Sequence, residues 1–497
     1  MMPAIAPGPE DRADDRDETN EVRCREFPKL EAEVKQMLEE YRHIHFIGIG
    51  GAGMSALAYV LVKRGFEITG SDLQVGHMAY ELAEAGAMVY MGHDDCQIEG
   101  ADAVVVSTAI PEKNPELAAA RRKNIPVLHR SDVLKALLNG ENVKGVAVAG
   151  AHGKTTTSAM IGVIAAEAGV DPTVVIGGDV AALGGNARNG ESEWVVAEAD
   201  ESDGSFLKFT PFIPVITNIE DDHLDHYGTE EKIYEAFKEY LSHMKPGGTG
   251  VLCIDNPKVR RLAGETDRAF VTYGLTDDCD FQARNVRQSV EGTDYELYHK
   301  GEKLIAVHLI VPGKHNVLNS LGAFAASMLM GIAPEVAAAA LAGFSGAKRR
   351  FETKGKENGI WIVDDYAHHP TEIGATLQAA RETGAKRIIC VFQPHRYTRT
   401  KLLYDEFCRC FGNCDKLILT HTYSAGEKPI PGISSQGLAN SIQTVTGKDV
   451  MYIDSFARAE EYLYKNCREG DLVITMGAGD VFRIGEELVR EFREVEK

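Results

Sequence analysis

The segment with the clearest chemical signal is a glycine-rich turn, Gly150-Ala151-His152-Gly153-Lys154-Thr155-Thr156-Thr157. Its Gly-Lys-Thr core lies between a predicted strand over 145–150 and a predicted helix, which is typical of a P-loop. In such a loop backbone N–H groups hold phosphates, Lys154 would reach the β- and γ-phosphates, and Thr155 would bind Mg²⁺. The general pattern has its first glycine where this chain has Val148. The segment predicts an ATP site formed by Gly150, Ala151, His152, Gly153, Lys154, Thr155 and Thr156.

An earlier turn carries a second phosphate-binding pattern. Gly48, Gly50 and Gly53 form G-x-G-x-x-G after a predicted strand over 43–49, and Asp72 follows roughly 20 residues on, as in dinucleotide-binding folds. Alone it would suggest NAD, but any nucleoside diphosphate, UDP included, meets the same backbone donors. A turn used only for packing is the alternative. Two such turns in separate α/β units exclude the simplest dehydrogenase, and they indicate one nucleotide as a substrate handle and the other as ATP.

Acidic and histidine side chains follow two later strands. Glu198-Ala199-Asp200-Glu201-Ser202-Asp203 comes directly after an apolar strand predicted over 194–197. Open α/β sheets bind ligands at this end of a strand, so we predict Glu198 as a Mg²⁺ ligand, with a solvated acidic loop as the alternative. His223 follows the next predicted strand, 214–219. Because Mg²⁺ prefers oxygen, the residues alone indicate a capping or surface histidine there.

The spacing of strands and helices must position these groups. Strands are predicted at 43–49, 67–70, 103–107, 145–150, 194–197, 214–219, 250–254, 360–364, 387–392, 416–420 and 471–476, with helices between most of them. Such alternation predicts parallel sheets with crossover helices. Residues 279–310 alternate polar and apolar side chains and predict antiparallel strands. We expect a partly disordered extension over 1–40, containing a short helix over 27–41, and domains over 41–141, 142–345 and 346–497.

Composition limits the class of protein. The 497 residues carry 53 basic and 74 acidic side chains, a net charge of −21, which argues against nucleic acid as the main partner. No apolar run is long enough to span a bilayer, and no signal peptide is recognisable, so we expect a cytoplasmic protein with no membrane partner. The nine cysteines indicate reduced thiols. Cys408, Cys410 and Cys414 are expected to be buried thiols beside an amphipathic helix over 404–411, in preference to a metal site.

Several motifs together resemble the Mur ligase family over about residues 43–490. After the P-loop come the acidic segment 198–203, Asn218-Ile219-Glu220-Asp221-Asp222-His223 and Pro312-Gly313-Lys314-His315-Asn316-Val317-Leu318-Asn319. Further on are Lys348-Arg349-Arg350-Phe351-Glu352, Asp364-Asp365-Tyr366-Ala367-His368-His369-Pro370-Thr371-Glu372 and Gln393-Pro394-His395-Arg396-Tyr397-Thr398-Arg399-Thr400. The resemblance implies an α/β architecture of three domains: a Rossmann-like N-terminal domain, a central P-loop ATPase domain and a Rossmann-like C-terminal domain.

The resemblance also implies a reaction. Within the family, His45 to Ser55 and the motifs 364–372 and 393–400 are similar to the branch that adds L-alanine to UDP-N-acetylmuramate in peptidoglycan synthesis, using ATP and Mg²⁺ through an acyl phosphate. A murein tripeptide recycling ligase or another ligase of the same mechanism is the first alternative. An NAD-dependent oxidoreductase and a non-catalytic nucleotide-binding scaffold are the others. We expect a monomer or homodimer.

The family's functional residues carry over by motif. Lys154 and Arg350 would stabilise γ-phosphate charge, Thr155 and Glu198 would hold one Mg²⁺, and His223 would hold a second. The remaining expected contacts are His315, Asn319 and Asp365 for ATP; Gly48, Gly50, Gly51, Gly53, Met54, Ser55, Asp72 and Ser107 for the UDP-sugar; and Tyr366, His368, Arg396 and Arg399 for the amino acid.

Three further expectations concern single side chains near these motifs. His368, His369 and His395 could instead cap or pack. Arg349 is expected to be a surface charge. Lys238 is either a carbamylated metal ligand, as at this spacing in several Mur ligases, or a plain helix-surface lysine.

Overall fold

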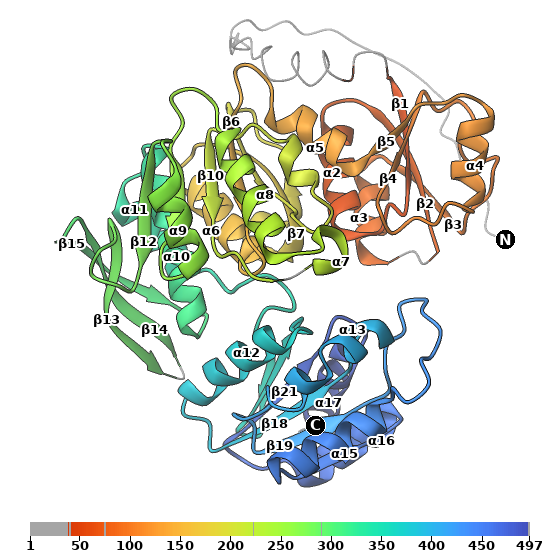
Figure 1. Ribbon diagram of the computed structural model, residues 1–497. Helices are drawn as coiled ribbons and strands as arrows, with labels where there is room; N and C mark the ends of the chain where they lie inside the picture. The colour runs from red at the N-terminus through yellow and green to blue at the C-terminus, as the bar shows by residue number, and fades with distance from the viewer. Residues whose placement is uncertain (1–37, 39–40, 74–75, 222, 290, 496–497) are drawn as a thin grey trace, which may run out of the picture.

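A computed structural model describes residues 38, 41–73, 76–221, 223–289 and 291–495, and Figure 1 shows three α/β units in chain order. Most of the predicted extension over 1–40, with its helix, lies outside these residues. The sheets span residues 43–129, 144–309 and 352–476, each within one predicted domain. The domain limits themselves stay a prediction. In the described part of the chain, no helix is long and apolar enough to cross a membrane.

The N-terminal unit contains a five-stranded parallel sheet in the order β3-β2-β1-β4-β5. Its glycine-rich turn follows β1 at the point where the strand order reverses, which is where doubly wound sheets bind ligands. The elements are β1 His43–Ile47, α2 Ala52–Lys63, β2 Glu67–Asp72, α3 His77–Ala85, β3 Met88–Met91, β4 Ala103–Val106, α4 Pro115–Arg122, β5 Val127–His129 and α5 Arg130–Leu138.

The middle unit contains a ten-stranded sheet in the order β15-β14-β13-β12-β11-β10-β6-β9-β7-β8. Strands β13, β14 and β15 pair antiparallel, as predicted for residues 279–310. The strands are β6 Lys144–Ala149, β7 Thr173–Val180, β8 Gly185–Arg188, β9 Trp194–Glu198, β10 Ile213–Ile216, β11 Gly250–Cys253, β12 Phe270–Gly274, β13 Phe281–Ser289, β14 Gly292–His299 and β15 Glu302–Leu309. The helices are α6 Lys154–Glu167, α7 Leu224–Tyr227, α8 Glu230–Ser242, α9 Pro257–Glu265, α10 Lys314–Leu329 and α11 Pro334–Ala342.

Strand β6 shows why this sheet is apolar on both faces. Side chains alternate across a strand, so Val146 and Val148 pack in the cluster of α6 and α10, whereas Ala147 and Ala149 pack in the cluster of α8. Helices therefore cover both faces, as in other mainly parallel sheets. The P-loop leaves β6 between its neighbours β10 and β9, where crossovers diverge.

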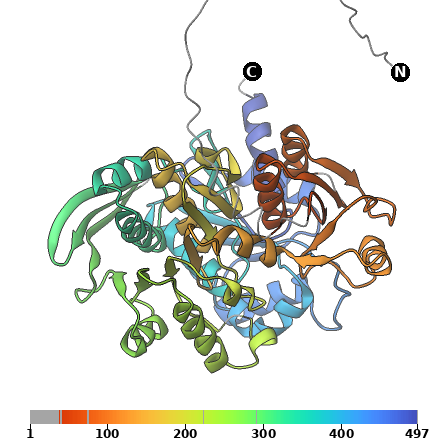
Figure 2. The ribbon, with the colours of Figure 1, turned by 90° about the horizontal axis from the view of Figure 1, so that it is seen from above.

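The C-terminal unit contains a six-stranded sheet in the order β16-β17-β21-β18-β19-β20, parallel except for the β16–β17 pair. In Figure 2, seen from above, this unit lies behind the other two. The elements are β16 Glu352–Glu357, β17 Ile360–Asp365, α12 Pro370–Glu382, β18 Arg387–Phe392, α13 Tyr397–Leu402, α14 Tyr404–Phe407, β19 Lys416–Leu419, α15 Ser435–Thr446, β20 Val450–Tyr452, α16 Phe456–Asn466, β21 Asp471–Met476 and α17 Phe482–Val495.

Several predicted strands end one or two residues early, and two predicted elements end at least three residues early. The strand predicted over 214–219 ends at Ile216, because Thr217 and Asn218 turn toward the P-loop and both donate hydrogen bonds to the His152 carbonyl, at 2.6 and 2.8 Å. The helix predicted over 404–411 ends at Phe407, where the backbone tightens and the Arg409 N–H donates to an oxygen three residues back.

Candidate active site

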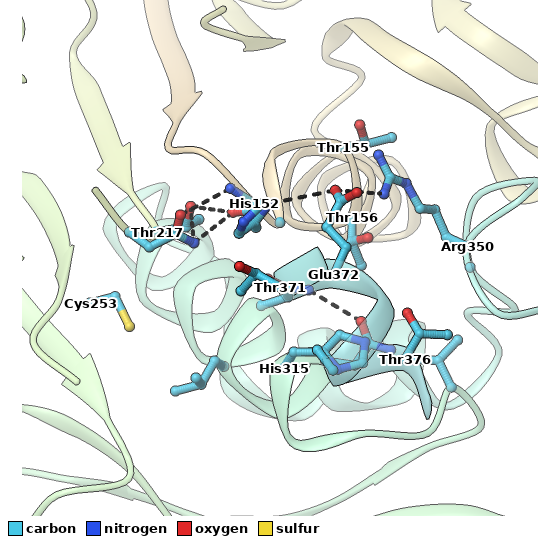
Figure 3. Close-up of a pocket in the computed structure, with 18 of the residues that line it drawn as sticks. His152, Thr155, Thr156, Thr217, Cys253, His315, Arg350, Thr371, Glu372 and Thr376 are labelled. Atoms are coloured by element: carbon cyan, nitrogen blue, oxygen red, sulfur yellow. Dashed lines mark hydrogen bonds and ion pairs between the residues drawn. The ribbon is translucent and has the colours of Figure 1, made fainter. Parts of the chain in front are cut away.

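A cavity of about 250 Å³ lies between the middle and C-terminal units. The P-loop and helix α10 line it from the middle unit, and β17 and α12 line it from the C-terminal unit. Figure 3 shows side chains of the P-loop, α10 and α12 around it. Among the predicted ATP contacts, the lining residues are His152, Gly153, Thr155, Thr156, His315, Asn319, Arg350 and Asp365. The structure therefore brings together residues that are more than 200 positions apart in the sequence.

Two glycines give the P-loop its shape. Gly150 has φ +136°, and a Cβ atom there would lie 2.1 Å from the Thr217 hydroxyl. Gly153 has φ +86°, and a Cβ atom there would lie 2.4 Å from the amide oxygen of Asn319. A side chain at either position would displace the loop from β10 or α10. The first glycine of the general P-loop pattern is replaced by Val148. Because Val148 is a buried residue of β6 and not part of the loop, a valine is compatible with the P-loop here.

Lys154 lies between the loop and an acidic side chain, with its own side chain 17% exposed. Its ammonium donates to the carbonyl oxygens of Gly150 at 2.6 Å and Ala151 at 3.3 Å, and to Glu201 at 2.8 Å. Burial alone would lower the pKa of Lys154, but the charges of Glu201 and Asp200 raise it above its usual range. The lysine therefore carries a positive charge at the site where a P-loop holds phosphate.

Glu201 is a residue that the sequence analysis missed. It is 3% exposed, and its second carboxylate oxygen receives no hydrogen bond from the described residues. His223, in a left-handed conformation at φ +60°, places Nε2 4.0 Å from the other oxygen. The acidic segment signalled a functional carboxylate, but the turn after β9 decides which one meets Lys154.

Glu198 lies at the end of β9, inside the strand and not beyond it. Its carboxylate accepts a hydrogen bond from the Gly177 N–H at 2.6 Å and another from Thr155, and burial raises its pKa. Within the described residues, no three His, Cys, Asp or Glu side chains gather as a complete metal site. Mg²⁺ in nucleotide sites takes one or two protein ligands with phosphates, so the Thr155–Glu198 pair fits this ion.

The far end of the cavity is formed by α10 and β17. His315 and Asn319 lie one turn apart on α10, and burial lowers the pKa of His315 to about 4, so its ring is neutral. Asp365 ends β17, and burial raises its pKa to about 6. Its carboxylate accepts hydrogen bonds from the N–H groups of Phe351 at 2.7 Å and Ala367 at 2.8 Å. Through these two hydrogen bonds, Asp365 holds the segment before β16 next to the segment after β17.

A larger chamber of about 620 Å³ is lined by all three units. Gly50 reaches it from the N-terminal unit, Thr155 from the middle unit, and Arg350 and Tyr366 from the C-terminal unit. Thr155 and Arg350 also line the smaller cavity, so the two spaces meet at these side chains. A ligand in the chamber would therefore lie next to the end of a nucleotide in the cavity.

Arg349 lines this chamber and is not a surface charge as predicted. Its side chain is 21% exposed, and its guanidinium donates to the buried Asp364 carboxylate at 3.0 Å. It also lies over the rings of Tyr366 and Phe482, with centroids 4.9 and 4.8 Å away. The buried carboxylate at the end of β17 draws the arginine inward.

The predicted amino-acid residues gather on two loops of the C-terminal unit. His368 and His395 have ring centroids 5.7 Å apart, and Arg399 approaches Nδ1 of His395 with its Nη1 at 3.1 Å. Burial lowers the pKa of both rings, to about 4 for His368 and about 3 for His395. Tyr366 lies against His368, with centroids 5.3 Å apart. Arg396 directly precedes α13 with φ +65°, on the loop that joins this group to β18.

The predicted UDP-sugar residues lie on the glycine turn after β1, in α2, at the end of β2 and just after β4. The turn residues Gly50 and Gly53 line spaces at the unit boundary. Gly48 and Gly51 hold the turn itself, since the Gly51 N–H donates to the Gly48 carbonyl at 3.2 Å. Ser107 lies in the turn after β4. Asp72 accepts a hydrogen bond from the Gly50 N–H at 3.0 Å, so its carboxylate already closes the turn.

Met54 and Ser55 lie in α2 and are only 3% and 2% exposed. Ser55 faces the middle unit, where Asn186 donates to its hydroxyl at 2.9 Å and to the Ala52 carbonyl at 2.6 Å. The Ser55 side chain therefore packs at the boundary between the two units, and a ligand role for Met54 and Ser55 stays a prediction.

Lys238 pairs with Glu265 at 2.8 Å on the surface of α8, and its side chain is 41% exposed. This favours the plain helix-surface lysine over the carbamylated metal ligand. Cys408 and Cys414 are buried, as predicted, and Cys410 is half-buried.

Comparison with known proteins also gives three successive segments of the chain, one for each sheet. Family models match residues 43–142 (Mur ligase family, catalytic domain), 148–327 (Mur ligase middle domain) and 349–479 (Mur ligase, glutamate ligase domain). The UDP-N-acetylmuramate–L-alanine ligase of Pelotomaculum thermopropionicum is 45% identical over 93% of this chain and 100% of its own length. That of Symbiobacterium thermophilum is 47% identical over 90% of this chain and 94% of its own length.

Solved structures of related ligases have the same fold. The UDP-N-acetylmuramate–alanine ligase of Thermotoga maritima superposes with a TM-score of 0.79 at 28% identity, over 91% of this chain and 99% of that one. A murein peptide ligase from Psychrobacter arcticus shares the fold, with a TM-score of 0.68 at 24% identity over 91% of this chain and 98% of that one. With the three-sheet architecture and the P-loop site described above, these matches establish that the chain belongs to the Mur ligase family.

Proposed function

We propose that this protein joins L-alanine to UDP-N-acetylmuramate in peptidoglycan synthesis, with ATP as the energy source. One observation carries the proposal: a relative named UDP-N-acetylmuramate–L-alanine ligase matches at 45% identity over 93% of this chain and over its entire length. The cavity and the chamber offer spaces for ATP and the UDP-sugar, and we assign L-alanine to loops of the C-terminal unit. We place the reaction in the cytoplasm, where UDP-sugars and ATP are available to a protein with reduced thiols, and we expect a monomer or homodimer.

ATP is assigned to the cavity between the middle and C-terminal units. The P-loop amides and the Lys154 ammonium would hold its phosphates, and Arg350 would approach the γ-phosphate from the C-terminal unit. His315 and Asn319 on α10 would contact the adenine or ribose. Because Arg350 belongs to another unit than Lys154, the two charges act together only when the units are closed, as the structure has them.

Magnesium is assigned to the phosphate end of the cavity. Thr155 and Glu198 would hold one Mg²⁺ together with nucleotide oxygens, and His223, whose Nε2 lies 4.0 Å from the Glu201 carboxylate, would stand at a second. The ion supplies charge neutralisation for the transferred phosphoryl group. The protein's own part is to keep Glu198 fixed by the Gly177 N–H and Lys154 charged.

UDP-N-acetylmuramate is assigned to the glycine turn after β1 and the adjoining chamber. The amides at the start of α2 favour a diphosphate, and the chamber leads from Gly50 to Thr155 and Arg350. The muramate carboxylate attacks the γ-phosphorus, a new P–O bond forms and the bond to ADP breaks. Holding both groups in one chamber is the main requirement of such a transfer.

L-Alanine is assigned to the loops of Tyr366, His368, Arg396 and Arg399. A guanidinium pairs with a carboxylate through two parallel hydrogen bonds, so an arginine here would orient the amino acid. The alanine nitrogen attacks the acyl carbon, the carbon–oxygen bond breaks, and phosphate leaves with that oxygen while the nitrogen loses a proton. His368 and His395 are neutral at physiological pH and do not repel the amino group.

An isotope-transfer experiment tests this sequence of steps. UDP-N-acetylmuramate labelled with ¹⁸O in the muramate carboxylate is incubated with the protein, ATP, Mg²⁺ and L-alanine, and the released phosphate is analysed by mass spectrometry. One labelled oxygen in phosphate is expected, together with the mass of the alanyl product. Phosphate without label would contradict the acyl phosphate, because it would mean that water attacked ATP.

A further inference from the structure

Glu372 is part of the N-terminal cap of α12. His369 caps α12, and the Glu372 carboxylate reaches back to accept hydrogen bonds from the N–H groups of His368 at 3.1 Å and His369 at 3.3 Å. This reciprocal arrangement is a capping box, in which one carboxylate oxygen satisfies the donors at the helix start. Both donors approach the same oxygen, Oε2, so the cap leaves Oε1 free for other partners.

Oxygen Oε1 of Glu372 points across the unit boundary. It lies 3.5 Å from Nδ1 of His152 in the P-loop and 3.8 Å from Nη1 of Arg350. Figure 3 shows the carboxylate between these two side chains, at the wall of the ATP cavity. The side chain is 15% exposed, so these contacts are made largely out of water. One carboxylate thus meets the loop and the arginine that are assigned to the phosphates.

The same carboxylate faces the amino-acid loop on its other side. Nδ1 of His368 lies 3.4 Å from Oε2 and 3.0 Å from the Tyr366 carbonyl oxygen. Because a carbonyl oxygen only accepts, Nδ1 must carry the proton, and Nε2 is left as the acceptor nitrogen. Glu372 and Tyr366 together fix both the tautomer and the orientation of this ring.

The charge state of Glu372 suits this position. Burial alone would raise its pKa, but the His152 imidazole and the Arg350 guanidinium hold the pKa of the carboxyl well below its usual range. It is therefore an anion among donors from two units. A capping residue on its own needs none of these additional contacts.

A second helix in the chain supplies the matched case. Helix α5 begins with the same type of capping box, in which His129 is the cap and Asp132 accepts the His129 N–H at 2.8 Å. Asp132 also crosses a unit boundary, since Lys208 donates to it at 2.6 Å. However, its carboxylate is 39% exposed and contacts no residue assigned to ATP or the amino acid. The carboxylates of the two caps therefore differ in the residues that they contact outside their own helix.

We propose that Glu372 is a positioning residue that links the nucleotide site to the amino-acid pocket. Its carboxylate ties the P-loop, through His152, to Arg350 and to the loop that carries Tyr366 and His368. When a nucleotide orders the P-loop, the same contact would hold the amino-acid loop in place. By linkage, the nucleotide then raises the affinity for L-alanine, and L-alanine raises the affinity for nucleotide by the same factor. This inference rests on the proposed function.

The first test is Glu372→Gln. Glutamine also serves in a capping box, so the start of α12 is kept while the negative charge is lost. We expect kcat/KM for L-alanine to fall about 10- to 100-fold, as for loss of a charged hydrogen-bond partner, with KM for UDP-N-acetylmuramate unchanged. The matched control, Asp132→Asn, is expected to change each constant by less than about twofold, as for an exposed ion pair.

The second test approaches the contact from the P-loop. His152→Asn leaves the cap of α12 untouched, and it too is expected to raise KM for L-alanine, although His152 lies in the nucleotide site. The losses of the two single variants are expected not to multiply in the double variant, because they break the same contact.

Three outcomes would overturn the inference: wild-type kcat/KM for L-alanine in Glu372→Gln, an unchanged KM for L-alanine in His152→Asn, or losses that multiply in full. Activity of the unaltered protein is measured first. If that protein forms no product with L-alanine, the proposed function itself is wrong, whereas a Glu372→Gln variant with wild-type kcat/KM for L-alanine refutes only the role of Glu372.

Discussion

The glycine-rich turns after β1 and β6 begin alike, since each joins a buried parallel strand to the start of a helix. They end differently. In the first, the Gly50 N–H already donates to the Asp72 carboxylate at 3.0 Å. In the second, Lys154 follows the last glycine and is held against Glu201 at 2.8 Å. The first turn donates a backbone N–H to an anion, whereas the second carries a largely buried cation.

This difference separates binding a phosphate from transferring one. A turn built of amides binds a diphosphate through partial charges and leaves it unreactive. A buried ammonium offers a full charge where water is largely excluded, which is where electrostatic stabilisation is strongest. We therefore assign the UDP-sugar to the first turn and ATP to the second, and the following predictions test that division.

The largest effect is expected for Lys154→Ala. Loss of the ammonium removes the charge that stabilises the transferred phosphoryl group, so kcat should fall on the order of 10³-fold. Phosphate release under saturating substrates measures it. UDP-N-acetylmuramate binding, measured by calorimetry, is expected to stay within about twofold of the unaltered protein. Equal losses at both nucleotide sites would break the comparison.

A smaller effect is expected for Glu201→Gln. The neutral side chain keeps the shape but no longer holds Lys154 in place, and loss of a charge-assisted hydrogen bond is worth about 1.5–3 kcal/mol. We predict that kcat/KM for ATP falls roughly 10- to 100-fold, from initial-rate measurements. Glu235→Gln, an exposed acid on α8, is the control. An unchanged constant in Glu201→Gln would show that Lys154 needs no partner.

The free energy of unfolding is expected to depend on pH through Asp365, which lines the ATP cavity. Burial raises the pKa of Asp365 to about 6 from 3.8, so the folded state favours the protonated carboxyl. This contribution to the free energy of unfolding is present below pH 3.8 and is lost as the pH rises through about 6. Urea unfolding at several pH values should show that loss, on the order of 3 kcal/mol, and Asp365→Asn should abolish it. The same slope in the variant would rule out Asp365 as its source.

The smallest effect is expected at the first turn. Asp72→Ala removes the acceptor of the Gly50 N–H, and one hydrogen bond of this kind contributes about 1 kcal/mol. KM for UDP-N-acetylmuramate should rise about fivefold while KM for ATP stays constant. Steady-state kinetics with each substrate varied in turn measures both. A change in KM for ATP instead would reverse the assignment of the two turns.

How much of this was predictable differs between residues. The strand–turn–helix placement of both glycine turns, the parallel sheets and the family follow from short local patterns, and they are confirmed. The pairing of Lys154 with Glu201 was missed because it depends on the turn after β9, which local spacing does not determine. Arg349 was misjudged because its partner Asp364 is buried by β17 and β21, which are more than 100 residues apart. The roles of the individual site residues stay predictions.

The most direct test of the account is phosphate release from ATP in the presence of UDP-N-acetylmuramate, with L-alanine compared against the tripeptide L-alanyl-γ-D-glutamyl-meso-diaminopimelate. The account predicts saturable release with L-alanine and only background release with the tripeptide. Release that depends on the tripeptide and not on L-alanine would contradict it.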